Sequence, residues 1–595
     1  SLAPKLYMEG VPLIDDINET TASITLDYQV SAEDDEGNTE LYDVTEFYRM
    51  RYTETRILLL DFKRSATKVF DPSQTVVSDA GLLLGIRDKN VTYSANSDGT
   101  IVVFEQDGDL WSYAPAGGKI TRIFSFRKEE NNDSRYVRND HDIKIIRVSD
   151  SGDVDFVLYG YMNRGIHEGY SGVCVYHYNS DRNVVEEKVF IPSTESYEFL
   201  KEDLGILTYV NKDNQLFLLF AQKLYQVDIE NGTSQVLEEG IRQNSFVVSD
   251  TKAHAAWLIT SGDDKGKLRE IEFDSLKTRD ILPESGQNLR ALGFMNEDFV
   301  YGIVADGDIL TDENGNKTEG ISTFRIESFE GELKKEYHQE GLYVTNVTVG
   351  TTMMEFELSA KSGNTYAAQK KDNIMNNSKA SGSQIDVALI TTNRAGTLIR
   401  LTISQKPETD NPLLVYSKIE STEDASVTLD TTVPQGELYY VYAYGSLDRI
   451  YTDPAAAVKR ADDQTGVVLN RAQQYVWERG NKKTKMQLNI EDVPEIIRTA
   501  SWKKDELQKG LGDTGTVIDL TGCSLDNVLY EVSAQRPVIA KTGDNSSVVI
   551  VGYDEYNTYL YDPATGQTNP YGLNDSTALF EKAGNVFLTY IENVT

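Results

Sequence analysis

Short alternating or apolar runs, separated by Gly, Asp and Asn, fill most of the chain between residues 50 and 370. One unit has an apolar run at 99–104, a turn at Asp107-Gly108, and further runs at 110–113 and 120–124. Asp-Gly between two apolar runs is a strong signal for a tight hairpin. Similar units follow along the chain, at 204–232 and near 143–190, 245–280 and 292–330. The pattern predicts a succession of small antiparallel sheets.

These units recur about every 45 to 55 residues, with three or four expected strands in each. One order of elements stands out: a strand, an Asp-Gly turn, a second strand, a Leu-Tyr-x-Val-Asp motif and an Asn-Gly turn, with the last two seen over residues 224–232. This order resembles bacterial β-propeller repeats. The resemblance implies a β-propeller over residues 49–370, of about six blades, with five or seven also open. Two β-sandwiches are the alternative arrangement for the same strands.

The segments on either side of this region are also rich in expected strands. Residues 1–48 contain one clear alternating run, from Ala22 to Val30, and are expected to form an N-terminal strand segment or cap. Residues 371–435 begin with a polar loop and return to short apolar runs. They are expected to form a connecting β-rich module or a last blade.

Helix and strand patterns mix for the first time in residues 436–595, which predicts an α+β domain. Asp453 before Pro454 is typical of a helix start, and Ser524 opens an amphipathic run. Two more helices are expected over 468–478 and 493–501. Strands are expected over 438–443, 537–540, 547–553, 558–562 and 585–591.

Two motifs in this domain resemble the papain-like domain of the C39-like (bacteriocin-processing-type) peptidase family. They are SSVVIVGYD, from Ser546 to Asp554, and LYDP, from Leu560 to Pro563. Residues 525–529 and 536–539 add support, and the resemblance covers residues 450–595. It implies a papain-like fold.

The resemblance also implies where a catalytic site would lie, because such peptidases use a cysteine at a helix N-terminus, a histidine and an orienting Asp or Asn. Asp562 matches the orienting position, but Ser546 stands at the histidine position and Val467 at the nucleophile position. A valine cannot attack a carbonyl, so the domain is expected to be a non-catalytic pseudo-peptidase. Cys523 is the remaining candidate nucleophile, and it would need a histidine from another domain, since all five lie between His141 and His338.

The charge balance narrows the range of partners. The chain has 94 acidic and 58 basic residues and a net charge of −36. Such a field repels phosphate backbones, so no nucleic acid partner is expected. No stretch of about 18 apolar residues is present, so no membrane insertion is expected in this segment. The abrupt Ser1-Leu2-Ala3-Pro4 start is typical of a chain trimmed of a leader or an N-terminal anchor.

One loop combines aromatic, basic and acidic side chains and is the candidate binding site. Tyr161, Arg164, His167 and Glu168 lie between two expected strands, where they could line the mouth of a propeller. One histidine and one glutamate do not make a metal site, so no metal is assigned there.

A second loop is a weak calcium candidate. Asp306, Asp308, Asp312, Asn314 and Asn316 place oxygen ligands close together, as calcium loops require. No bidentate Glu follows at EF-hand spacing, so an acidic hairpin between blades is the alternative. Otherwise no cofactor is expected.

Together these patterns predict a mainly β protein, with a β-propeller followed by an α+β papain-like domain. The expected function is non-catalytic binding of a protein or peptide partner, in a protein that is secreted or attached to the surface of a bacterium. Three alternatives stay open: an active C39-like cysteine peptidase using Cys523, a propeller-based glycan enzyme with two carboxylates, and a purely structural envelope component.

Overall fold

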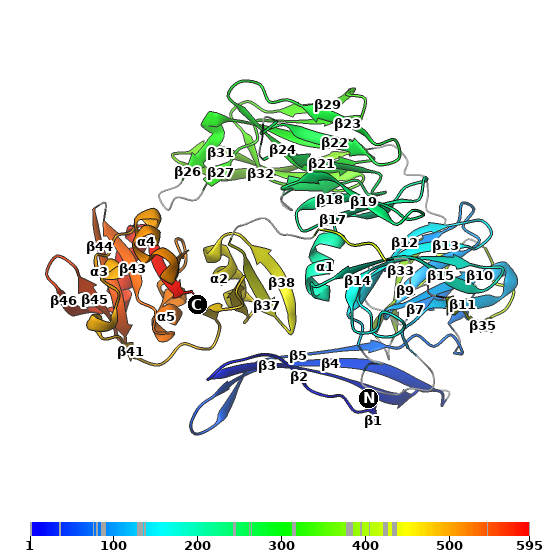
Figure 1. The fold of residues 1–595 in the computed structure, drawn as a ribbon, viewed down its shortest axis with the longest axis horizontal. Coiled ribbons are helices and arrows are strands. Elements are labelled where there is room, and N and C mark those ends of the chain that lie inside the picture. Colours follow the sequence, from blue (N-terminus) through cyan, green and yellow to red (C-terminus); the bar gives the residue numbers. More distant parts are fainter. Residues whose placement is uncertain are drawn as a thin grey trace.

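The computed structural model describes residues 3–34, 37–74, 76–78, 81–84, 91–127, 135, 138–241, 245–260, 262, 264–311, 317–376, 385–392, 396–403, 405–420, 426–430, 437–543 and 545–593. Strands in antiparallel sheets predominate. In Figure 1 the N-terminal sheet lies at the bottom, a series of small sheets occupies the right and the top, and the C-terminal region lies at the left. Among the described residues, no helix has the length and apolar character needed to cross a bilayer.

The N-terminal sheet contains five strands: β1 (Lys5–Met8), β2 (Leu13–Ile17), β3 (Thr21–Glu33), β4 (Thr39–Tyr52) and β5 (Ile57–Lys68). β3 pairs with β4 along its whole length, and β4 pairs with β5. The boundary expected at residue 48 therefore falls inside β4. The alternating pattern continues past that point, so the N-terminal unit extends to Lys68.

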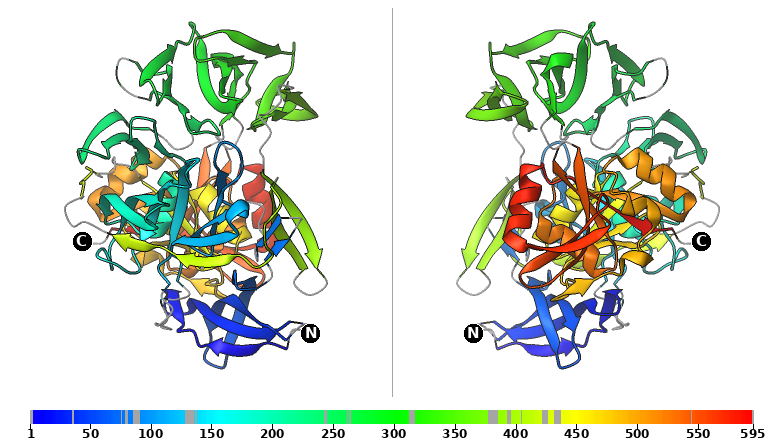
Figure 2. Two further views of the ribbon diagram at one scale, coloured as in Figure 1. Left: turned by 90° about the vertical axis from the view of Figure 1, so that its right-hand side faces the viewer. Right: turned by 90° about the vertical axis from the view of Figure 1, so that its left-hand side faces the viewer.

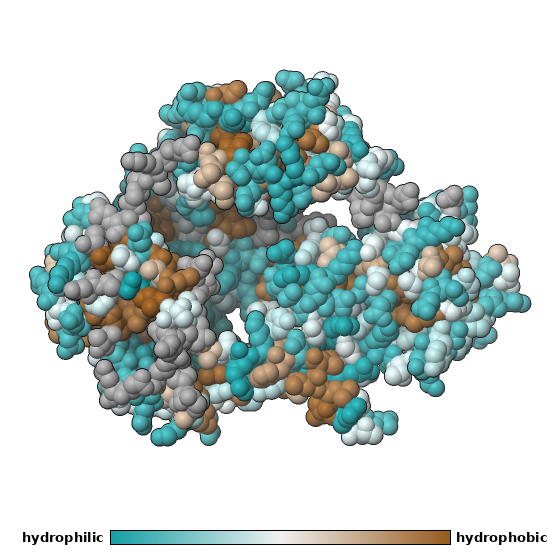
Figure 3. All heavy atoms as spheres, turned by 180° about the vertical axis from the view of Figure 1, so that it is seen from behind, coloured by the Kyte–Doolittle hydropathy of each residue, from teal (hydrophilic) through white to brown (hydrophobic). Residues whose placement is uncertain are grey.

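The N-terminal sheet also carries an exposed apolar surface. Leu6, Val11, Ile17 and Ile57 are each more than half exposed. In the view from behind in Figure 3, brown atoms gather along the lower edge, where this sheet lies, on a largely hydrophilic surface. Patches of this kind mark interaction surfaces more often than isolated apolar residues do.

Seven small antiparallel sheets follow in the described residues between 77 and 403, and Figure 2 shows them from both sides. The first combines β6 (Val77–Ser78) and β7 (Gly81–Leu84) with β33 (Ile385–Thr392) and β34 (Gly396–Ile403), so its strands come from opposite ends of this region. The second contains β8 (Tyr93–Ala95), β9 (Val102–Gln106), β10 (Asp109–Ala114) and β11 (Lys119–Phe124), and the third β12 (His141–Val148), β13 (Val154–Tyr161), β14 (Ser171–Asn179) and β15 (Val184–Ser193).

The remaining four sheets continue in chain order. The fourth contains β16 (Thr208–Val210), β17 (Gln215–Phe220), β18 (Lys223–Asp228) and β19 (Thr233–Glu239), and follows α1 (Tyr197–Leu204). The fifth contains β20 (Phe246–Val248), β21 (His254–Leu258), β22 (Leu268–Glu272) and β23 (Lys277–Ile281). The sixth contains β24 (Gln287–Met295), β25 (Asp298–Ala305), β28 (Thr323–Glu327) and β29 (Leu333–His338), with the small β26 (Ile309–Thr311) and β27 (Lys317–Glu319) hairpin between its strands. The seventh contains β30 (Tyr343–Val349), β31 (Met353–Ser362) and β32 (Thr365–Met375).

Consecutive sheets pack face to face because their central strands are apolar on both sides. In β17, Leu216 and Leu218 belong to the cluster shared with the third sheet, while Phe217 and Leu219 belong to the cluster shared with the fifth. Each consecutive pair of sheets shares such a cluster. In the described ranges, no cluster joins the seventh sheet to the first, so the packing is a series.

The hairpin expected at Asp107-Gly108 is confirmed. Gln106 pairs with Asp109, and both turn residues have positive φ, 55° at Asp107 and 78° at Gly108. A Cβ on Gly108 would also approach the His141 ring to 2.9 Å. Glycine is therefore required at this position for both its backbone angle and its lack of a side chain.

A return segment, residues 413–420 and 426–430, runs back over the outer edges of these sheets. β35 (Leu413–Tyr416) pairs in parallel with β11, and β36 (Lys418–Glu420) pairs in parallel with β15. Farther on, Val427 donates to the Phe190 carbonyl, and Lys223 contacts Asp430. The segment covers strand edges that would otherwise expose unpaired backbone groups.

The C-terminal region contains two sheets and five helices in its described residues. The first sheet has the order β38 (Ser446–Tyr451), β37 (Tyr439–Ala443), β39 (Val467–Asn470), β40 (Tyr475–Glu478). The second contains β41 (Met486–Gln487), β42 (Gly515–Asp519), β43 (Val538–Gly543), β44 (Ser546–Tyr553), β45 (Asn557–Asp562), β46 (Gln567–Gly572) and β47 (Phe587–Glu592). The helices are α2 (Pro454–Asp463), α3 (Glu495–Arg498), α4 (Lys504–Leu511), α5 (Leu525–Ser533) and α6 (Leu573–Lys582).

Two of the four helices expected here differ in the structure. Residues 467–478 form the β39–β40 hairpin, and the helix expected near 493–501 shortens to α3. Val467, Val468, Tyr475 and Trp477 favour strands, and β39 completes a sheet with β37, so the expected helix at 468–478 was wrong. α2 and α5 were predicted correctly, with Asp453 as the N-cap of the former.

Candidate functional site

A cavity of about 1310 Å³ lies where segments far apart in the chain meet. The N-terminal sheet contributes residues near Asp15 and Arg49. The α1 region contributes Glu195, Glu198, Phe199 and Glu202, residues 220–222 with Gly240 and Thr260 add a small part, and the β37–β40 sheet contributes most of the remaining wall. This acidic cavity could not be located from the sequence because its walls are several hundred residues apart.

The cavity is strongly acidic. Eight carboxyl groups line it, against the guanidinium groups of Arg49 and Arg471; the acidic residues are Asp15, Asp16, Glu195, Glu198, Glu202, Asp203, Glu437 and Asp453. Five of these have partners in the structure: Asp16 pairs with Arg49, Asp203 accepts from the Ala221 amide, Asp453 caps α2, and Asp15 and Glu198 accept from the hydroxyl groups of Thr25 and Ser196. The other carboxyls leave a field that attracts cations.

α1 places two like charges on the same side of one helix. Glu198 and Glu202 are four residues apart and both line the cavity, while Leu200 and Leu204 are buried on the opposite face. Like charges at this spacing destabilise an isolated helix by a few tenths of a kcal/mol. A cation bound in the cavity would relieve that repulsion.

Aromatic side chains form much of the remaining wall. In β37, Tyr439 and Val441 point into the C-terminal core, so the alternation of a strand turns Tyr440 and Tyr442 toward the cavity. The Phe199 ring of α1 meets the Tyr440 ring edge-on at 5.2 Å. Tyrosine faces attract cations, and their hydroxyl groups can bond a ligand.

The crowded carboxyls have perturbed pKa values. Reduced hydration among the surrounding protein atoms raises the pKa of Asp15 to about 6, and the charges of Asp16 and Asp27 add to this. The Asp15 side chain is nevertheless exposed, and it accepts a hydrogen bond from Thr25 at 2.8 Å. Burial and the neighbouring Asp203 also raise the pKa of Glu202. As the pH falls, these carboxyls therefore take up protons before carboxyls with an ordinary pKa do, and the cavity loses negative charge.

The expected peptidase positions are not arranged as a catalytic site. Val467 begins β39, is 2% exposed and lines the acidic cavity. Ser546 begins β44 in the other sheet, where it accepts from Thr542 at 3.0 Å. Asp562 ends β45 and accepts from the Ala564 amide at 2.8 Å, which closes a turn. The assignment of Val467 to a helix N-terminus was wrong because residues 467–470 pair as a strand.

Cys523 lies in the core of the C-terminal region. Its thiol is fully buried, and its sulfur lies 3.7 Å from the Ala455 carbonyl oxygen. Burial raises the pKa of Cys523 to about 12, which suppresses the nucleophilic thiolate. Each of the five histidine rings has its partner within the sheet series, at Gly108, Glu187, Asp155, Glu270 or Ser322.

A second hollow, of about 500 Å³, lies beside the candidate binding loop. The structure brings Arg164 and His167 together in its lining, but Tyr161 and Glu168 are not part of that lining. Glu168 pairs with Arg135 at 2.5 Å in solvent. His167 pairs instead with Glu187 of β15, at 2.7 Å between Nε2 and Oε1, a partner that the sequence did not indicate.

The calcium candidates are only partly described. Asp308 pairs with Lys361 at 2.6 Å, and Asp306 accepts from Asn288 at 2.9 Å. Asp312, Asn314 and Asn316 lie outside the described residues. The lysine already neutralises the Asp308 carboxylate, which makes this carboxylate a poor calcium ligand.

No protein-family model and no curated protein matches the chain. Among solved structures, a putative C39-like peptidase from Bacillus anthracis is similar with 19% identity, 15% coverage of this chain and a TM-score of 0.13. Dipeptidyl peptidase 4 from Porphyromonas gingivalis has 11% identity, 55% coverage and a TM-score of 0.24, and TolB from Acinetobacter baumannii has 11%, 47% and 0.19. The chain spans 57%, 60% and 83% of these three proteins, respectively. TM-scores this low do not establish a shared overall fold.

Proposed function

We propose that the protein binds a basic, extended segment of a polypeptide in the acidic cavity, without turning it over. The observation that carries the proposal is the excess of eight carboxyls over two guanidiniums in a cavity that is also lined by seven aromatic rings. Lysine and arginine side chains combine a cationic head with a long apolar stem, so they suit a wall of carboxylates and rings.

The size of the cavity supports a peptide rather than a single ion. About 1310 Å³ exceeds the usual volume of a small-molecule site. Two walls already contact each other at Phe199 and Tyr440, so a ligand would bind between a helix and a sheet that are already packed together. The buried Cys523 thiol and the valine at position 467 support binding without peptide hydrolysis.

Two statements about the fold belong to the same proposal. We infer that the seven sheets are blades of a β-propeller, because consecutive sheets pack face to face and strands from both ends of the region share the first sheet. A succession of small sheets in which each inner sheet packs against both of its neighbours favours a propeller over two β-sandwiches, in which each sheet would pack against one partner. We infer a degenerate C39-like origin only for the β42–β47 sheet, whose β44 and β45 carry the two motifs.

The proposed location is outside the cell, because a secreted or surface-attached bacterial protein fits a partner-binding role. Protease treatment of intact cells, which removes surface-attached proteins, tests that location.

The test is binding of a fluorescent oligolysine peptide, compared with an oligoglutamate peptide of equal length, by anisotropy at low and high salt. Glu198→Gln combined with Glu202→Gln is expected to weaken oligolysine binding about five- to tenfold at low salt, since each exposed charge pair contributes up to about 1 kcal/mol. The matched control is Glu555→Gln with Glu581→Gln, which removes the same charge from exposed positions outside the cavity. Equal weakening by both double variants, or equal binding of both peptides, would refute the proposal.

A further inference from the structure

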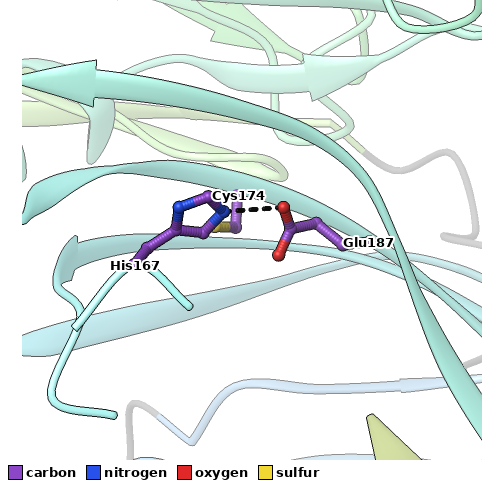
Figure 4. Close-up of side chains that lie close together, drawn as sticks. All are labelled: His167, Cys174 and Glu187. Carbon is purple, nitrogen blue, oxygen red and sulfur yellow. Dashed lines mark hydrogen bonds and ion pairs between the residues drawn. The ribbon is translucent and has the colours of Figure 1, made fainter. Parts of the chain in front are cut away.

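A histidine, a cysteine and a glutamate meet beside the second hollow. In the described residues, His167, Cys174 and Glu187 are the only group of three such residues whose ligand atoms all lie within 4.8 Å of one another. Figure 4 shows the imidazole and the carboxylate facing each other, with the sulfur beside them. The three side chains come from a loop, from β14 and from β15.

An irregularity in the pairing of two strands creates this group. Val175 pairs with Val189 and Tyr176 pairs with Glu187, so Lys188 is an extra residue in β15. Such a bulge changes which face the following side chains occupy. It sets Glu187 on the same face of the sheet as Cys174 and Phe190, which belong to a hydrophobic cluster.

The loop that carries His167 is fixed from both ends. Met162 and Tyr170 are joined by a backbone hydrogen bond of 2.8 Å, and Gly169 donates to the Met162 carbonyl. The His167 ring stacks on Phe190, with centroids 3.7 Å apart and planes 15° apart. The imidazole is therefore held over the same sheet face as the other two side chains.

The carboxyl of Glu187 is incompletely satisfied by the protein. Its side chain is 1% exposed, and Oε1 bonds His167 while Oε2 has no hydrogen-bond partner among the described residues. Its surroundings include the buried side chains of Cys174 and Tyr176. Burying a carboxylate oxygen without a partner costs several kcal/mol, so such a group usually has a further ligand.

We propose that His167, Cys174 and Glu187 bind a zinc ion, with the fourth position open toward the 500 Å³ hollow. Zinc binds imidazole nitrogen, thiolate sulfur and carboxylate oxygen at about 2.0–2.3 Å in a tetrahedral arrangement. The metal would bind Nε2 of His167, whose imidazole would keep one proton on Nδ1 and release any second proton to solvent, and it would bind a carboxylate oxygen of Glu187. The Cys174 thiol would release its proton to solvent as the sulfur binds the metal. Ligand atoms in a tetrahedral zinc site lie roughly 3.3–3.7 Å apart, so Nε2 of His167 and Oε1 of Glu187, which are 2.7 Å apart, would separate to admit the ion, and any pair near the 4.8 Å limit would move closer.

The hollow gives the proposed ion a route of entry and an exchangeable ligand. His167, Glu187 and Arg164 all line it. Three protein ligands with an open fourth position are typical of zinc sites that bind water or an anionic group. A carboxylate-bearing ligand, placed between the zinc and the guanidinium, would suit this hollow.

The experiment is titration of the metal-free protein with Co²⁺, followed by displacement with Zn²⁺. Wild-type protein is expected to bind one equivalent and to show visible d–d bands with a near-ultraviolet sulfur-to-cobalt charge-transfer band. Cys174→Ser should lose the charge-transfer band, and His167→Ala and Glu187→Gln should each weaken binding by more than about tenfold. Circular dichroism checks that each variant folds, and the loop variant His167→Ala keeps the test decisive if Cys174→Ser does not fold.

The chain supplies two matched controls. Cys523→Ser removes the other cysteine, and His177→Ala breaks a second histidine–carboxylate pair, at 2.7 Å from Asp155, that belongs to no such group of three in the described part of the chain. Both should bind Co²⁺ as the wild type does. Binding of less than one equivalent by the wild type, a charge-transfer band that survives Cys174→Ser, or loss of the band in Cys523→Ser would overturn the proposal. None of these outcomes depends on peptide binding in the acidic cavity.

Discussion

Arg49 of β4 and Glu478 of β40 form a buried ion pair, 3.4 Å between nitrogen and oxygen, across 429 positions of the chain. Their side chains are 1% and 5% exposed. Arg49 also pairs with Asp16 and donates to the Arg479 carbonyl, while Glu478 accepts from Asn18 and Thr21. This network holds the N-terminal sheet against the β39–β40 hairpin, and so fixes two walls of the acidic cavity.

Replacing Arg49 with methionine is expected to lower the free energy of unfolding by roughly 3–5 kcal/mol, because Glu478 would remain buried without its cation. Urea denaturation followed by fluorescence measures the change. Adding Glu478→Gln to this variant should restore part of the loss. Arg325→Met, which breaks an exposed pair with Glu336, is the control and should cost at most about 1 kcal/mol. Similar costs for both arginine variants would contradict the structural role of Arg49.

Binding of oligolysine is expected to strengthen between about pH 5 and about pH 7.5. The Asp15 carboxyl has a pKa of about 6, so its negative charge is largely absent at the lower pH and present at the higher one. Anisotropy titrations at both pH values measure the effect. Asp15→Asn should bind more weakly at the higher pH and show a smaller difference between the two. An unchanged pH dependence in this variant would show that Asp15 does not contribute.

Glu270 should make the protein less stable as the pH rises. Burial raises the pKa of this carboxyl to about 8, and Glu327 adds to the rise while Arg279 opposes it. Folding therefore favours the protonated form, whose contribution is complete below the unfolded pKa near 4.5 and is lost as the pH passes 8. Thermal unfolding at about pH 5 and about pH 8.5 should show a smaller loss of Tm in Glu270→Gln than in the wild type. An equal loss would contradict this.

Cys523 is expected to resist thiol reagents in the folded protein, because it is fully buried and its pKa is about 12. Quantitative labelling with a chromogenic disulfide reagent should detect neither cysteine before denaturant is added, and both afterwards. The Cys174→Ser variant isolates the signal of Cys523. Rapid labelling of Cys523 in the folded variant would reopen the cysteine peptidase alternative.

Local signals in the sequence were sufficient for several elements. Asp107-Gly108 predicted a hairpin because few turns match the twist of two strands, and Asp453 with Pro454 predicted the start of α2. Ser524 predicted α5, where the structure adds a capping box with Asn527. In each case the deciding contacts lie within a few residues of the signal.

Where the deciding contacts were distant, prediction from the sequence failed. The periodicity of residues 468–478 did not show that Val468 would pair with Val441 of β37. The candidate loop contained His167, but its partner Glu187 was displaced onto the same face by a bulge twenty residues later. The repeated Val and Glu residues of β15 do not indicate where such a bulge forms.

By itself, the sequence determined the strand-rich character of residues 49–370, the acidic charge and the positions of the tightest turns, because these follow from residue type and nearest neighbours. Only the tertiary structure decided that the ends of the sheet series share one sheet, that β4 meets β40, and that carboxyls and tyrosines from three segments line one cavity. The physical reason is that burial and charge pairing depend on which surfaces come together in space. Many pairings satisfy the same alternating pattern, and the packing of the whole chain selects among them.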